Sequence, residues 1–62
     1  MSTNQAAKRA VQVYNMALRR TNDSAEAYVR GLDFLIDIIY HDDKIGKVTM
    51  RAIRIYERTI SA

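Results

Sequence analysis

The stretch KVTMRAIRIYER, from Lys47 to Arg58, decides the fold because it can be interpreted as a strand or as a helix. β-branched residues are frequent in it, which favours a strand. A strand alternates with a period of two, however, and would divide the basic residues between its two faces. A helix turns 100° per residue and gathers those basic residues on one face. We therefore predict a helix over residues 44–60, whose inner face is formed by Ile45, Val48, Ala52, Ile55, Tyr56 and Thr59.

The segment before this helix carries a helix start signal. In TNDSAEAY, residues 21–28, Asp23 is placed to cap a new helix, and Glu26 is placed to reach back as in a capping box. We predict a second helix over residues 24–41 with two apolar stripes, so that it has to be covered on two sides. The first stripe holds Ala25, Tyr28, Val29, Leu32, Leu35, Ile36, Ile39 and Tyr40, and the second holds Ala27, Gly31, Phe34 and Ile38.

The N-terminal third of the chain shows the same helical period. Its apolar residues fall on one half of a helical wheel and are mainly small: Ala6, Ala7, Ala10, Val11, Val13, Tyr14, Ala17 and Leu18. We predict a first helix over residues 4–20. Its alanines would allow a neighbouring helix to approach closely.

Together these patterns predict one all-α domain over residues 1–62, built as a compact three-helix unit. A chain of 62 residues without cysteine buries little apolar surface and has no disulfides to stabilise it. Self-association is the remaining source of buried area, so we expect a homodimer packed through the central helix along Ala27, Gly31, Phe34 and Ile38. Glycine inside a helix costs about 1 kcal/mol relative to alanine, so Gly31 indicates close approach of another element. The alternative for this second stripe is that the first and third helices of the same chain cover it.

Charge is distributed in three blocks along the sequence. Residues 1–22 hold four basic residues and no acid, residues 23–43 hold six acids against Arg30, and residues 44–62 hold five basic residues against Glu57. A surface that serves only solubility usually mixes the two signs. The separation therefore favours a partner for the basic faces of the first and third helices.

We expect that partner to be nucleic acid, DNA or RNA, held through its phosphates with little reading of the bases. The predicted nucleic-acid-binding residues are Lys44, Lys47, Arg51, Arg54 and Arg58 on the third helix and Lys8, Arg9, Arg19 and Arg20 on the first. Two alternatives stay open. The protein is a protein–protein interaction module or inhibitor, which grips an acidic protein surface with the same basic row or a partner with the Gly31 seam; or some of the arginines simply pair with Glu26, Asp33 and Asp37.

Other classes of function have weaker support. Asp37 and His41 are four residues apart on one helix face, but consecutive helical residues diverge by 100°, so the run His41, Asp42, Asp43 does not converge on a metal ion while it stays helical. With one histidine, no cysteine and no glycine-rich phosphate loop, we expect no enzyme activity, no metal and no cofactor. No apolar run approaches the roughly 20 residues of a membrane span, so we expect a cytoplasmic protein without a membrane partner.

Overall fold

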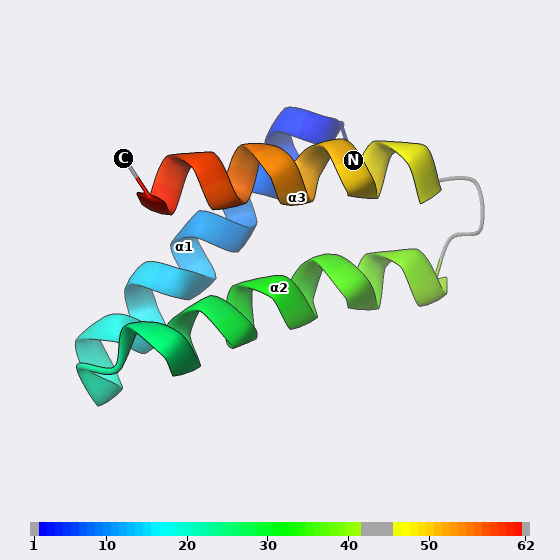
Figure 1. Ribbon diagram of the computed structural model, residues 1–62. Coiled ribbons are helices and arrows are strands. Elements are labelled where there is room, and N and C mark those ends of the chain that lie inside the picture. The colour runs from blue at the N-terminus through cyan, green and yellow to red at the C-terminus, as the bar shows by residue number, and fades with distance from the viewer. Residues whose placement is uncertain (1, 42–45, 62) are drawn as a thin grey trace.

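Three helices make up the described part of the chain (Figure 1). The computed structural model describes residues 2–41 and 46–61, and for residues 39–41 and 46–49 it describes the backbone alone. α1 spans Thr3–Thr21, α2 spans Ser24–His41 and α3 spans Gly46–Ser61. Neither described range contains a strand. The all-α, three-helix prediction is therefore confirmed, while the predicted start of the third helix at Lys44 and Ile45 lies outside the described residues.

α1 begins earlier than its apolar pattern predicts because its N-terminus carries a capping box of its own. The amide of Gln5 donates to Oγ of Ser2 at 3.2 Å, and the amide of Ser2 donates to Oε1 of Gln5 at 3.2 Å. At the other end, Asn22 adopts the left-handed conformation with φ 54° and donates its amide to the carbonyl of Leu18 at 2.8 Å. Asparagine is one of the few residues that tolerate this conformation, so α1 ends there.

The start of α2 confirms one half of the predicted cap and corrects the other. Oδ1 of Asp23 accepts from the amides of Ala25 at 3.0 Å and Glu26 at 3.2 Å, as a capping aspartate does. The Glu26 carboxylate does not reach back to Asp23. It pairs with Arg30 one turn further on at 3.3 Å, and the amide of Asp23 donates instead to Oγ1 of Thr21 at 3.2 Å. The capping-box prediction for Glu26 is therefore wrong.

α1 is the element that holds the other two together. In Figure 1, α2 and α3 run antiparallel, and α1 crosses both of them. α1 contacts each of the other helices more extensively than they contact each other. The alanine face of α1 enters the core, where the buried residues are Ala6, Ala7, Ala10, Leu35, Ala52 and Tyr56. Small side chains at this crossing allow the helices to pack closely, as the alanine pattern predicts.

The two stripes of α2 are not both covered. Ala27, Gly31 and Leu35 are buried, whereas Val29 keeps 50% and Ile36 keeps 37% of its surface exposed, and Ala25 is exposed as well. The prediction that the whole first stripe faces inward is therefore wrong. α2 is apolar around most of its circumference, and two partner helices on adjacent sides leave Val29 and Ile36 on the open side.

Candidate nucleic-acid interface

The outer face of α3 presents three arginines to solvent. Arg51, Arg54 and Arg58 are exposed, while Ala52 and Tyr56, on the opposite side of the same helix, are buried. The face follows from spacing, because residues three and four apart lie next to one another on a helix. At a rise of 1.5 Å per residue, the three arginines extend over roughly 10 Å.

Acidic neighbours do not neutralise this face. Glu57, the one acid in the sequence of α3, accepts a hydrogen bond from the Tyr28 hydroxyl of α2 at 2.7 Å. Glu26, one of the α2 acids expected to compensate the arginines, pairs with Arg30 within its own helix. Within residues 2–41 and 46–61, no ion pair joins Arg51, Arg54 or Arg58 to a residue whose side chain is described.

The remaining predicted cations of α3 fall at its start. The side chain of Lys47 is not described, although its backbone belongs to α3, and Lys44 lies outside the described residues.

The basic residues of α1 are all exposed, but they point in different directions. Lys8 and Arg9 border a shallow hollow with Gln5 and Gln12. Lys8 also lines the groove between α1 and α3, whose other lining residues are Asn4, Ala7, Val11, Ile55 and Thr59. Because Arg51 and Arg58 are one turn from Ile55 in either direction, Lys8 lies beside the α3 arginines. Of the α1 cations, Lys8 is therefore the one that the structure places next to the α3 face.

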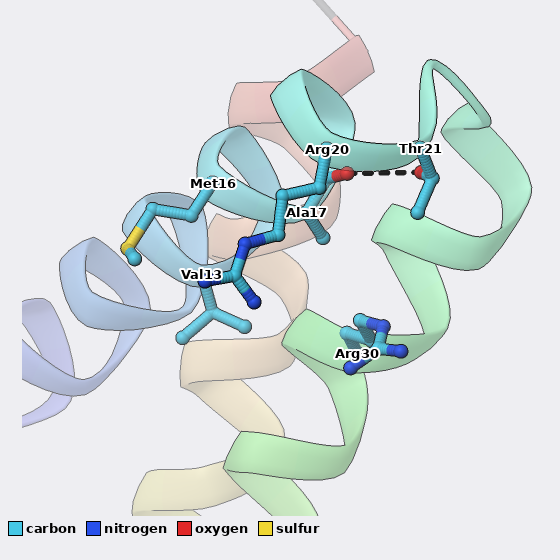
Figure 2. Close-up of a pocket in the computed structure, with 6 residues that line it drawn as sticks. All are labelled: Val13, Met16, Ala17, Arg20, Thr21 and Arg30. Carbon is cyan, nitrogen blue, oxygen red and sulfur yellow. Dashed lines mark hydrogen bonds between the residues drawn. The ribbon is translucent and has the colours of Figure 1, made fainter.

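Arg19 and Arg20 lie in the last turn of α1. A cation at that position favours the negative end of the helix dipole, which gives both residues a structural role as well. Arg20 extends toward the cleft between α1 and α2, where Arg30 approaches from the other helix (Figure 2). The sequence did not predict this pairing of Arg20 with Arg30 across a cleft. No helical wheel contains it, because it depends on how two helices pack.

The predicted seam on α2 lies partly inside the chain. Ala27 and Gly31 are buried, and Phe34 and Ile38 are half-buried against the core. The close approach predicted at Gly31 is confirmed: a Cβ atom built there would lie 2.5 Å from Cζ and 2.8 Å from Cε1 of Tyr56. The element that approaches is the ring of a tyrosine from α3 of the same chain. Ala27 and Gly31 are thus already covered, as in the alternative to a dimer seam.

Three tyrosines join the helices next to this point. The rings of Tyr28 and Tyr56 stack with centroids 5.9 Å apart and planes 7° apart, and Tyr14 of α1 meets Tyr56 edge-on at 6.4 Å. The Tyr56 hydroxyl donates to the carbonyl of Tyr28 at 2.8 Å. Burial raises the pKa of Tyr56 to about 12, and the hydrogen bond to the Glu57 carboxylate raises the pKa of Tyr28. These rings pack with one another and the core, which confirms their predicted packing role over a role in stacking bases.

Among the described residues, no group of three histidine, cysteine, aspartate or glutamate side chains is arranged to bind a metal ion. The metal site considered at His41, Asp42 and Asp43 lies where side chains are not described. None of the helices, over the ranges that are described, has the length and apolar content needed to cross a membrane. Comparison with family models, with curated proteins and with solved structures finds no match for this chain. The functional argument therefore depends on the chain's own residues.

Proposed function

We propose that the protein is a small non-enzymatic helical regulator that binds nucleic acid through the basic faces of α3 and α1. The observation that carries the proposal is the exposed α3 face of Arg51, Arg54 and Arg58, which has no ion pair within the described part of the chain. Arginine presents two parallel donors to a phosphate group, so a row of arginines matches successive phosphates of a nucleic-acid backbone. Recognition of this kind depends on charge and spacing, with little preference for sequence.

A salt titration tests this proposal. Binding to duplex DNA and to duplex RNA is measured by fluorescence anisotropy at several salt concentrations. A face that neutralises about five phosphates gives a slope near −4 in a plot of log affinity against log salt. Replacing both Arg51 and Arg54 by alanine is expected to make that slope shallower by about two units.

A charge-matched control separates the face from the net charge. Ser24→Glu with Ala25→Glu lowers the net charge by the same amount as the two arginine-to-alanine changes, but at exposed positions in the first turn of α2. We expect this control to keep the original slope, because phosphate contacts are local. An equal loss of binding in both variants, or no binding of the unchanged protein at low salt, contradicts the proposal.

The second candidate function is that of a protein–protein interaction module. It is favoured by the exposed apolar side chains of Met16, Val29 and Ile36, which lie away from the α3 arginines. The original version of this candidate, in which the Gly31 seam grips a partner, is less favoured because Tyr56 covers Gly31. A homodimer remains part of the proposal, since a two-fold pair would present both basic faces twice.

A further inference from the structure

The cleft between α1 and α2 combines exposed apolar side chains with charges of both signs. Met16 on α1 is 60% exposed, and Ile36 on α2 is 37% exposed. Single exposed apolar residues are ordinary, but these two border hollows that share one floor. We call this surface the α1–α2 face and define it by Val13, Met16, Arg20, Arg30, Asp33 and Ile36.

Two hollows form this face and are continuous with each other. The first has a volume of about 220 Å³ and is lined by Val13, Met16 and Ala17 of α1 together with Arg20, Thr21 and Arg30 (Figure 2). The second is shallow and is lined by Val13 with Arg30, Asp33, Phe34, Ile36 and Asp37. Val13 and Arg30 belong to both hollows, so one apolar groove runs along the junction of the two helices.

Charge divides this groove into a cationic end and an acidic end. Arg20 and Arg30 line the end near the connection between α1 and α2, and Asp33 lines the other end. Asp33 lies three residues beyond Arg30, which is one turn along α2. A two-fold rotation about a point between Arg30 and Asp33 would bring the cationic end of one copy over the acidic end of the other. The pattern is self-complementary, which is the requirement for an isologous interface.

Other occupants fit this face less well. A nucleic acid or an acidic peptide along the groove would meet the carboxylate of Asp33, and a basic peptide would meet Arg20 and Arg30. A second copy in antiparallel orientation satisfies both ends and covers Met16 and Ile36 together. A standard interface takes about 800 Å² from each partner, roughly a sixth of the 4716 Å² that this chain exposes.

We propose that the α1–α2 face is the homodimer interface of this protein, with Arg30 of each copy opposite Asp33 of the other. The interface lies on the open side of α2, next to Phe34, and leaves the buried Ala27 and Gly31 inside each chain. It deepens the part of the proposed function that concerns a dimer, and it does not require that the basic faces bind nucleic acid. The α3 arginines stay exposed in such a dimer, because they lie on a different helix.

Sedimentation velocity without nucleic acid tests the proposal over a concentration range from micromolar to near-millimolar. The unchanged protein is expected to sediment as a dimer at the upper end of that range. Met16→Ser is expected to raise the dissociation constant by about tenfold, because it removes an apolar contact from the interface. Met50→Ser is the matched control, since Met50 on α3 is 57% exposed and lies outside the α1–α2 face. That control is expected to leave the dissociation constant unchanged.

Charge-reversed variants test the orientation of the two copies. Arg30→Asp makes this part of the groove acidic, and Asp33→Arg makes it basic, so each variant alone is expected to be mainly monomeric. An equimolar mixture of the two is expected to restore the dimer, because opposite charges then face each other across the interface. Circular dichroism of each variant checks that its helical content is preserved.

Three results would overturn the proposal: a protein that stays monomeric at near-millimolar concentration, equal effects of Met16→Ser and Met50→Ser, or a charge-reversed pair that fails to associate on mixing. If Met16→Ser fails to fold, the mixing experiment decides alone. A failed nucleic-acid titration with an intact dimer would reject the proposed function and leave this interface standing. Salt-dependent binding by a strict monomer would have the opposite meaning.

Discussion

Gly31 and Tyr56 make the tightest contact between α2 and α3. Glycine is the residue that a helix interior tolerates least after proline, and at this position the Tyr56 ring occupies the space that a Cβ atom would take. Tyr56 itself is fully buried and donates its hydroxyl hydrogen bond to the carbonyl of Tyr28, three residues before the glycine. The missing side chain of Gly31 is thus the condition for burying a large aromatic residue.

We expect Gly31→Ala to destabilise the protein although alanine is the better helix former. The helix gains about 1 kcal/mol from the substitution, and the collision with a buried ring costs about 1–3 kcal/mol. The net loss of unfolding free energy, up to about 2 kcal/mol, is measured by urea denaturation. In a Tyr56→Leu background the collision disappears, so the same Gly31→Ala change should become stabilising. A destabilisation of equal size in both backgrounds would show that Tyr56 is not its cause.

At the scale of single helices, the cap of α2 is made by one carboxylate. Asp23 accepts from two amides, those of Ala25 and Glu26, and the Glu26 side chain adds nothing to the cap because Arg30 binds it. Asp23→Ala should therefore lower the unfolding free energy by about 1 kcal/mol, a typical cost of losing an N-cap. Thermal denaturation followed by circular dichroism measures the change. Ser24→Ala, one residue further on, is the matched control and should have a much smaller effect.

Sequence periodicity predicts these helices well where their composition is divided between two faces. α3 has a charged side and an apolar side, so the exposed positions of Arg51, Arg54 and Arg58 follow from spacing alone. α2 is different, because apolar residues surround most of it and several faces fit the core equally well. Which face is left open depends on where α1 crosses, and that is a property of the whole fold. For this reason the sequence did not predict the exposure of Val29 and Ile36.

Over the whole molecule, three tyrosines connect the three helices at one point. Tyr14 comes from α1, Tyr28 from α2 and Tyr56 from α3, and the ring of Tyr56 contacts both of the others. α2 and α3 share few contacts otherwise, so this cluster carries much of their association. A charge on the Tyr56 oxygen would therefore disturb the packing of all three helices together.

This arrangement predicts a loss of stability in alkaline solution. The pKa of Tyr56 rises from 10.0 to about 12 on folding, so the folded chain keeps a proton that the unfolded chain releases between these two values. Stability is then complete below about pH 10 and falls as pH rises toward 12, by an amount on the order of 2 kcal/mol. Urea denaturation at several pH values between 8 and 12 measures this dependence.

Tyr56→Phe is the variant that assigns the alkaline effect. It keeps the ring and its stacking but removes the ionisable oxygen, so the unfolding free energy should fall by about 1 kcal/mol near neutral pH, where the hydrogen bond to the Tyr28 carbonyl is lost. Above pH 10 the variant should lose less stability than the unchanged protein. The raised pKa of Tyr28 leaves it a smaller dependence of the same sign, because the phenol bound to Glu57 also holds its proton longer in the folded chain. An alkaline loss of the same size in both proteins would place its origin outside the buried tyrosine, and the three-helix junction would then tolerate ionisation of its central ring.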